Sequence, residues 1–300
     1  MMHPTVQAFF DPATFTVSYL VSDPDTKAAA IVDPVADFEP KGARLSHASA
    51  EAILGAIAQQ GLELLYVLET HAHADHLSAA DYIRGRTGAK IVIGAHITEV
   101  QKQFVPLFEA EDVASDGRAF DRLVSEGDGL PLGRLSIRVL HTPGHTPACV
   151  TYFIGDAAFV GDTLFMPDYG TARADFPGGD AASLYRSARK ILALPPATRI
   201  FVGHDYLPAG RTEYRWETTV AEQRARNIHI HDGVSEQAFV TMRRARDAAL
   251  PPPTLILPAL QVNIRAGALP PASPGGHVFL RLPVTDAEVQ TDRNAGKGSQ

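Results

Sequence analysis

The residues most able to do chemistry in this sequence are histidines and aspartates gathered in one short segment. Residues 71–76 read HAHADH. In extended backbone, His71 and His73 are two residues apart, so their side chains point to the same side. Asp75 and His76 fall where the chain turns toward an expected helix, which can bring their side chains to the same place. Imidazole and carboxylate together suit zinc, iron or manganese, so the segment predicts a metal site.

Three further groups stand at the apparent ends of later strands. His145 lies in TPGHTP, Asp162 in FVGDTLF and His204 in FVGHDY. In α/β folds, loops beyond strand ends gather site residues from distant parts of the chain. A glycine before each of the three permits a tight turn that aims the side chain. A lone His-x-His is usually a chance surface feature, but the full pattern predicts a metal centre with these candidate ligands: His71, His73, Asp75, His76, His145, Asp162 and His204.

The other histidines and the single cysteine are expected to be structural. His96 suits a helix start and His141 a strand end. Asp33, which ends an apolar strand, suits a turn or an acceptor behind the ligands. Cys149 leads into a β-prone run and is predicted to be buried and inert. Solvated or structural roles are predicted for His3, His47, His229, His231 and His277.

Helices and strands alternate around these motifs. Apolar periodicity and turn residues predict strands at 5–10, 16–22, 28–34, 63–70, 90–95 and 198–203. Helices are expected at 49–61, 78–86, 181–194, 213–226 and 235–249. From residue 134 the pattern is more purely β, with a tight hairpin turn at Gly155-Asp156. This rhythm indicates a mixed sheet covered by helices.

Length and composition exclude several classes of protein. The 300 residues are 45% hydrophobic, which is enough for one large domain or a domain with an extension. A net charge of −7 and a pI near 5.9 argue against a nucleic-acid partner and give no sign of attraction to membranes. No apolar run approaches the roughly 20 residues that span a bilayer, and no secretory signal is recognisable. With one cysteine and no signal, a cytoplasmic location is expected.

Taken together, the HxHxDH, GH, GD and GH motifs resemble the metallo-β-lactamase superfamily over roughly residues 5–210. That resemblance implies an α/β fold, the αββα sandwich with a metal site at one edge. We expect a catalytic domain over residues 1–212, a helical C-terminal extension over 213–284 packed on the same domain, and a flexible tail over 285–300. The superfamily includes hydrolases, lactonases, flavodiiron proteins and dioxygenases, so the fold leaves the reaction open.

Later segments are similar to bacterial persulfide dioxygenases. These segments are GDTLFMPDYGTARADFPGGDAASLYRS (161–187), GHDY (203–206), RWETTVAEQRARNIHIHDG (215–233) and LILPALQVNIRAG (255–267). The group that they resemble is the β-lactamase-hydrolase-like proteins of sulfide detoxification, related to the mitochondrial ETHE-type enzyme. The resemblance implies that an iron-dependent enzyme oxidises a small persulfide, glutathione persulfide in that family, with O₂ to sulfite and thiol.

The resemblance also implies roles for individual residues. A single Fe(II) would be held by His71, His145 and Asp162, which leaves open positions for substrate sulfur and O₂. Residues that surround this site and orient its ligands would be His73, Asp75, His76 and His204. A glutathione-like substrate needs cations for its carboxylates, and the matching segments offer Arg173 and Arg265, with Tyr206 as a hydrogen-bond donor near the metal.

Two other functions stay open. In a binuclear zinc hydrolase of the glyoxalase II or lactonase kind, all seven candidate ligands would bind two Zn(II) ions. Asp162 would bridge them, and a hydroxide would attack a thioester or lactone carbonyl. The sequence keeps every residue that this function needs, but the chain after Asp162 is more similar to the dioxygenases. A metal-sensing or scaffold protein is the third possibility. Related proteins suggest a homodimer.

Overall fold

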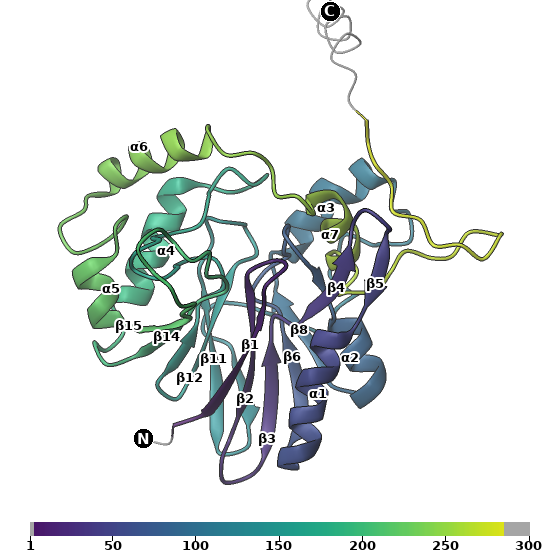
Figure 1. The fold of residues 1–300 in the computed structure, drawn as a ribbon, viewed down its shortest axis with the longest axis horizontal. Coiled ribbons are helices and arrows are strands. Elements are labelled where there is room, and N and C mark those ends of the chain that lie inside the picture. The colour runs from purple at the N-terminus through teal and green to yellow at the C-terminus, as the bar shows by residue number, and fades with distance from the viewer. Residues whose placement is uncertain (1–2, 285–300) are drawn as a thin grey trace, which may run out of the picture.

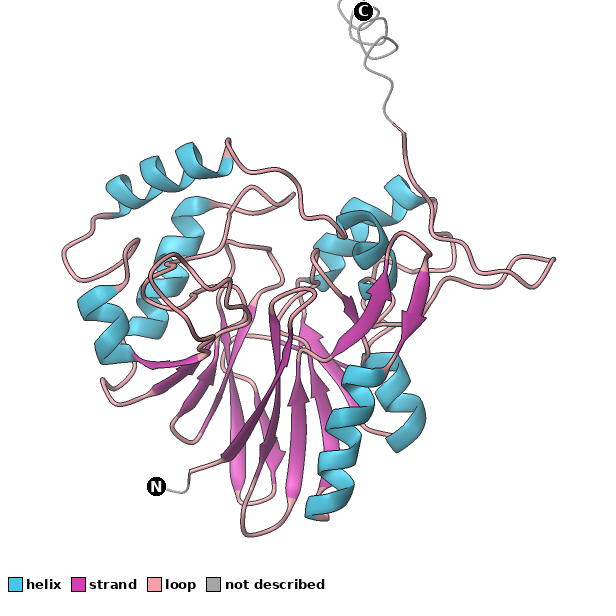
Figure 2. Cartoon of the chain, viewed as in Figure 1, coloured by secondary structure: helices cyan, strands magenta, loops and turns pink. Residues whose placement is uncertain are grey.

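Two six-stranded sheets lie face to face in the computed structural model of the chain, which describes residues 3–284. Helices cover the outer face of each sheet, so the layers run helix, sheet, sheet, helix (Figures 1 and 2). This is the αββα sandwich that the resemblance to the metallo-β-lactamase superfamily implies, and the expected fold class is confirmed.

The first sheet combines antiparallel and parallel strands. Its order is β1 (Thr5–Asp11), β2 (Thr16–Ser22), β3 (Ala28–Val32), β6 (Glu63–Leu68), β8 (Lys90–Gly94) and β9 (Arg122–Val124). The strands β3, β6, β8 and β9 run parallel. The helices packed with this sheet are α1 (Ala48–Gln60), α2 (Ala80–Thr87), α3 (Ile97–Phe108) and α7 (Ile256–Asn263). A small sheet beside it has the order β5 (Arg44–Ser46), β4 (Val35–Glu39) and β7 (Leu77–Ser78).

The second sheet is mostly antiparallel. Its order is β10 (Gly129–Leu132), β11 (Leu135–His141), β12 (Val150–Ile154), β13 (Ala157–Phe159), β14 (Arg199–Phe201) and β15 (Glu217–Thr219). The helices on its outer side are α4 (Ala181–Leu192), α5 (Val220–Arg226) and α6 (Glu236–Asp247). Ile154 pairs with Ala157 across Gly155, whose φ of 63° suits the tight turn, so the predicted hairpin is confirmed.

Side-chain alternation along the strands divides the core into layers. On β2, Tyr19 and Val21 face the other sheet, whereas Leu20 packs with the cluster under α1 and α2. The second sheet behaves in the same way, because Phe201 points between the sheets and Ile200 points toward α4. Successive strand residues point to opposite faces, so a sheet that is covered on both sides must be apolar at nearly every position.

One predicted helix is wrong over its first part. The segment 213–226 was expected to be helical, but its residues Glu217–Thr219 form β15 and pair with β14. The helix α5 starts only at Val220, where the Thr219 hydroxyl accepts a hydrogen bond from the backbone N–H of Glu222. β-Branched threonines suit an edge strand, and the second of them also caps the helix. The sequence did not predict β4, β5, β7, β9, β10 or α7, and of α3 it predicted only the start at His96.

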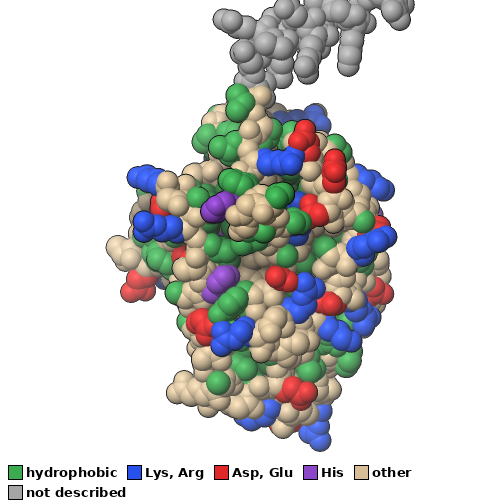
Figure 3. Space-filling view, turned by 90° about the vertical axis from the view of Figure 1, so that its right-hand side faces the viewer, with side chains coloured by type: hydrophobic (Ala, Val, Ile, Leu, Met, Phe, Trp, Pro, Cys, Tyr) green, Lys and Arg blue, Asp and Glu red, His purple; other side chains and the backbone are tan. Residues whose placement is uncertain are grey.

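The C-terminal extension ends in an irregular segment, residues 268–284. Two hydrogen bonds tie it to α7, because Gln261 donates to the carbonyl of Arg281 and accepts from its N–H, at 2.9 and 2.8 Å. On the face toward α1 and α7, Lys and Arg side chains are interspersed with Asp and Glu, and hydrophobic side chains gather on part of it (Figure 3). Among residues 3–284, no helix is long and apolar enough to cross a membrane. The tail predicted at 285–300 lies outside the described residues.

Candidate metal centre

All seven candidate ligands come together at one edge of the sandwich. Residues 71–76 follow β6, His145 lies between β11 and β12, Asp162 follows β13 and His204 follows β14. An isolated bridge between Thr16 and His204 joins the first sheet to the second at this edge. The strand-end loops therefore converge as the motif spacing predicts.

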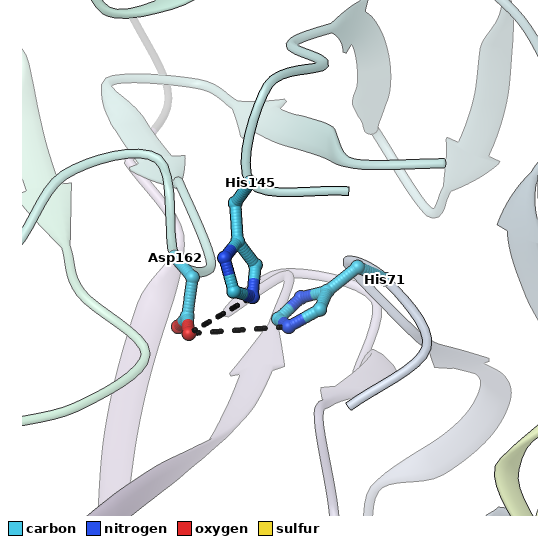
Figure 4. A group of neighbouring side chains, drawn as sticks. All are labelled: His71, His145 and Asp162. Carbon is cyan, nitrogen blue, oxygen red and sulfur yellow. Dashed lines mark ion pairs between the residues drawn. The ribbon is translucent and has the colours of Figure 1, made fainter. Parts of the chain in front are cut away.

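Three of the side chains form a tight group. The Oδ2 atom of Asp162 lies 3.6 Å from Nε2 of His145 and 4.0 Å from Nε2 of His71. One ligand atom from each of the three lies within 4.8 Å of the others. Figure 4 shows the three side chains pointing toward one another from separate loops. Two imidazoles and one carboxylate in this arrangement suit a single first-row transition metal.

A second set of ligand atoms lies on the other side of Asp162. Its Oδ1 atom is 3.4 Å from Nε2 of His204, and that nitrogen is 3.3 Å from Oδ2 of Asp75. Nδ1 of His76 is 3.4 Å from the same Asp75 oxygen. Burial acts to raise the pKa of Asp75, but the nearby His204 and His76 hold it well below its usual value. The carboxylate is therefore ionised and available to a cation.

Hydrogen bonds to their other ring nitrogens orient two of the ligands. The Thr70 hydroxyl lies 2.8 Å from Oδ2 of Asp33 and 3.0 Å from Nδ1 of His71. Because ionised Asp33 can only accept, the hydroxyl donates to it and accepts from His71, which leaves Nε2 of His71 without a proton. Nδ1 of His145 donates to the carbonyl of Arg173 at 2.8 Å, so the neutral ring carries its proton on Nδ1 and presents a bare Nε2. Metal-binding histidines are commonly fixed in this way.

His73 has different surroundings. Its Nε2 lies 3.0 Å from Oδ1 of Asp33 and 3.3 Å from Oε2 of Glu69. Burial acts to lower the pKa of His73, but the two carboxylates raise it well above its usual value. For His71, in contrast, burial and the neighbouring imidazoles lower the pKa well below its usual value. His71 is thus the better neutral donor to a metal.

Unpartnered polar atoms indicate that these residues fit a metal. Among the described residues, the buried side-chain atoms without a hydrogen-bond partner are few, and most belong to the candidate ligands: Nε2 of His71, Nδ1 of His73, Nε2 of His76, Oδ1 of Asp162 and Nε2 of His204. Such atoms are costly to bury unless something satisfies them. A bound cation would do so for both sets.

The three predicted glycines act in two different ways. Gly144 and Gly161 have φ values of 138° and 49°, which other residues adopt with strain. Gly203 has no such backbone requirement. A Cβ atom on it would lie 2.7 Å from Oδ1 of Asp162, so the glycine allows His204 to approach the central carboxylate.

A cavity of about 470 Å³ opens onto this site. Asp75, His145 and Asp162 are part of its wall, and α6 and the segment after it supply another part. The aromatic residues around it are Phe15, Phe38, Phe165, Tyr169 and Tyr206, and the arginines are Arg173, Arg243 and Arg246. Its size is in the range of small-molecule sites.

The three predicted substrate contacts have separate locations. Tyr206 lines the cavity, and burial raises the pKa of its hydroxyl well above the usual value, so it stays a hydrogen-bond donor. Arg173 also lines the cavity, but its guanidinium forms a bidentate pair with Asp175 at 2.6 and 2.7 Å and donates to the carbonyl of Pro251. Arg265 is not among the lining residues. It pairs with Asp112 beside a different cavity.

The motifs did not reveal two residues that are important to the site. Thr70 stands directly before HxHxDH and was given no role. Asn263, at the end of α7, accepts from the N–H of Ser78 and donates to the carbonyls of His73 and His76, each at 2.8 Å. Its neighbour Arg265 had seemed the functional residue of that segment. The only signal in the sequence was a polar asparagine within the mostly apolar segment 255–267.

The residues predicted to be structural also have clear places. Cys149 is buried, as expected, and its burial raises the pKa of the thiol to about 12. Asp33 accepts from the N–H of Thr70 at 2.7 Å and is the predicted acceptor behind the ligands. His229 is buried and accepts from the N–H of Thr171 at 3.0 Å.

The sequence matches the model of the metallo-β-lactamase superfamily over residues 11–204, and the chain belongs to that superfamily. Among its relatives, a "probable metallo-hydrolase" of Burkholderia pseudomallei is 53% identical over 93% of this chain and 99% of that protein. A β-lactamase hydrolase-like protein of Agrobacterium fabrum is 51% identical over 96% of this chain, but the chain spans only 66% of its length.

Similarity extends to persulfide dioxygenases. The human mitochondrial persulfide dioxygenase ETHE1 is 31% identical over 89% of this chain and 91% of that protein. The crystal structure of ETHE1 from Myxococcus xanthus superimposes with a TM-score of 0.70, at 31% identity, over 88% of this chain and 100% of that chain. The expected membership of this branch of the superfamily therefore agrees with both sequence and structure.

Proposed function

We propose that this protein is an iron-dependent persulfide dioxygenase, which oxidises a small thiol persulfide with O₂ to sulfite and thiol. The observation that carries the proposal is the compact set of His71, His145 and Asp162 at the wall of a cavity. The similarity of the protein to persulfide dioxygenases over most of its chain supports the same function.

Each residue of the set has a definable task. A ferrous ion held by His71, His145 and Asp162 would supply the redox chemistry and open positions for both reactants. Thr70 and the carbonyl of Arg173 keep the two imidazoles in the tautomer that presents Nε2. Tyr206, kept protonated by its burial, would donate a hydrogen bond to a substrate in the cavity.

A cation near the cavity mouth suits an anionic substrate such as glutathione persulfide. Arg173 and Arg243 have their donors engaged by protein groups. Arg246 also lines the cavity, is exposed, and makes no side-chain hydrogen bond or ion pair with any residue in 3–284. We therefore assign the substrate carboxylate contact, first expected of Arg173 and Arg265, to Arg246.

Substitution of Arg246 tests this assignment. Arg246→Gln should raise KM for glutathione persulfide about 10- to 100-fold with little change in kcat, because a charge-assisted contact is worth about 1.5–3 kcal/mol. Arg244→Gln is the matched control, since Arg244 is exposed on the same helix but does not line the cavity. An unchanged KM in Arg246→Gln would remove this residue from the substrate site.

A binuclear zinc hydrolase is the second candidate, and one observation favours it. The atoms of His73, His76 and His204 that would bind a second ion are buried and unpartnered. The name of the Burkholderia relative points the same way. Asp75 and Asp162 would complete that second site.

Metal content and O₂ consumption separate the two functions. After anaerobic purification, we expect about one iron per chain and O₂ uptake that depends on added glutathione persulfide. His71→Ala and Asp162→Ala should abolish iron binding, whereas His73→Ala should retain it. Two zinc ions per chain with thioester hydrolysis and no O₂ uptake would overturn the proposal.

A further inference from the structure

The C-terminal extension contains a buried ion pair that no part of the reaction uses. Arg243 and Asp247 are one helical turn apart on α6, with exposed fractions of 2% and 6%. The guanidinium Nη2 and Nε atoms lie 2.7 and 2.8 Å from Oδ1 of Asp247. A buried ion pair costs much of its attraction in lost hydration, so it adds little to stability by itself. Its other contacts therefore matter.

Both members of the pair bind the backbone of the loop that supports His145. Arg243 donates from Nη1 to the carbonyl of Thr171 at 3.1 Å. The other carboxylate oxygen of Asp247, Oδ2, accepts from the N–H of Ala174 at 2.9 Å. Between these two contacts stands the carbonyl of Arg173, which accepts the hydrogen bond from Nδ1 of His145 at 2.8 Å.

Further contacts hold the same loop to the extension. The Arg173 side chain donates to the carbonyl of Pro251, just beyond α6, at 2.7 Å. On the other side, a Cβ atom on Gly179 would lie 2.6 Å from the carbonyl oxygen of Ala174 and 2.9 Å from that of His145. The loop thus lies between the His145 loop and α6 with little room to move.

We propose that Arg243 and Asp247 are positioning residues of the metal centre, which fix the Arg173 carbonyl and through it the orientation and tautomer of His145. This inference rests on the metal-binding part of the proposed function and makes α6 part of the metal centre. Partners of metal ligands usually contribute 10–100-fold to affinity. Because the pair acts one step further away, we expect its loss to cost about 10-fold.

Cobalt binding tests the proposal without the reaction. Full-length protein freed of metal is titrated with Co²⁺, whose visible spectrum reports the ligands. Asp247→Asn should bind Co²⁺ about 10-fold more weakly and with an altered spectrum, because its NH₂ group must face either the N–H of Ala174 or the guanidinium of Arg243, which breaks one of the two contacts that hold the loop. The control Asp232→Asn breaks an exposed pair with Arg224 and Arg189 and should leave both measurements unchanged.

A merely structural role predicts a different result. Asp247→Asn would then lower the melting temperature but keep the wild-type Co²⁺ affinity and spectrum, and that outcome would overturn the proposal. If this variant does not fold, Arg243→Lys keeps the buried charge and shortens the reach to Thr171. Wild-type Co²⁺ binding by a folded Arg243→Lys would overturn the proposal equally.

O₂ uptake by the wild-type protein is measured separately. If wild-type protein binds Co²⁺ but consumes no O₂ with persulfide, the dioxygenase function fails and the positioning role stands. If uptake is observed but both variants bind Co²⁺ normally, the function stands and the positioning role fails. The two ideas therefore fail in different measurements.

Discussion

At the scale of single residues, the metal centre depends on atoms behind the ligands as much as on the ligands themselves. Asp33 has a φ of 48°, an uncommon value for an aspartate, and directs its carboxylate at Thr70 and His73. The Thr70 hydroxyl, which donates to Asp33, accepts in turn from Nδ1 of His71. A chain of buried polar groups thus decides which nitrogen of His71 faces the metal.

Thr70→Val should weaken metal binding by 10–100-fold while the protein stays folded, because valine has the same shape but cannot accept from Nδ1 of His71. Isothermal titration of metal-free protein with Fe²⁺ under anaerobic conditions measures the effect. Thr98→Val, in α3, is a matched change whose hydroxyl only contacts the carbonyl of Ala95. Equal affinities for the two variants would mean that Thr70 does not orient His71.

At the scale of elements, α7 holds the HxHxDH loop as α6 holds the loop of Arg173. Asn263 ends α7 and is only 4% exposed, and its amide makes the three backbone contacts to residues 73–78. Gly267, shortly after the helix, lies so close to β7 and α2 that a Cβ atom on it would be 2.9 Å from the carbonyl of Ser78. The extension therefore packs against the metal loop from outside.

Asn263→Ala should lower the free energy of unfolding by about 3 kcal/mol, since each buried group left unpaired costs about 1–3 kcal/mol. It should also weaken metal binding, because the loop of His73 and His76 loses its support. Urea unfolding with and without metal gives both numbers. Gln103→Ala, at an exposed position of α3, controls for loss of a polar side chain and should change stability by less than about 0.5 kcal/mol.

At the scale of the whole molecule, the buried His229 makes stability depend on pH. Burial and the nearby Arg243 and Arg246 lower the pKa of His229 to about 4, whereas an unfolded histidine titrates near 6.5. Between these two pKa values the unfolded chain binds a proton that the folded protein does not bind, so acidification favours unfolding. Below about pH 4 both states are protonated, and this contribution no longer changes.

His229→Asn should keep the acceptor for the N–H of Thr171 but remove the titration. From pH 6.5 to 5, wild-type protein should lose up to about 2 kcal/mol more stability than the variant. Urea unfolding at both pH values, in the same metal state, measures the difference. His231→Asn, at an exposed histidine, should follow the wild type. Parallel pH profiles for His229→Asn and wild type would contradict the assignment.

The sequence by itself was enough to name the candidate ligands that the fold brings together, and to predict most strands of the two large sheets. The pattern HxHxDH and the strand-end GH, GD and GH motifs are local signals, because ligand types and turn glycines stand beside each other in the chain. The strands β2, β3 and β6 were predictable for the same reason, since each is a run of mostly apolar residues bounded by turn residues. Short edge strands such as β5 and β9 carry too few residues for such a pattern.

Only the tertiary structure decided which arginines line the cavity, which of them are held by protein groups, and what orients the ligands. Arg173, Arg246 and Arg265 are alike as sequence, but Asp175, open solvent and Asp112 make their surroundings different. In the same way, the contact of Asp247 with Ala174 joins residues 73 positions apart. Hydrogen bonds over such separations arise from packing of whole layers, so no local spacing in the chain records them.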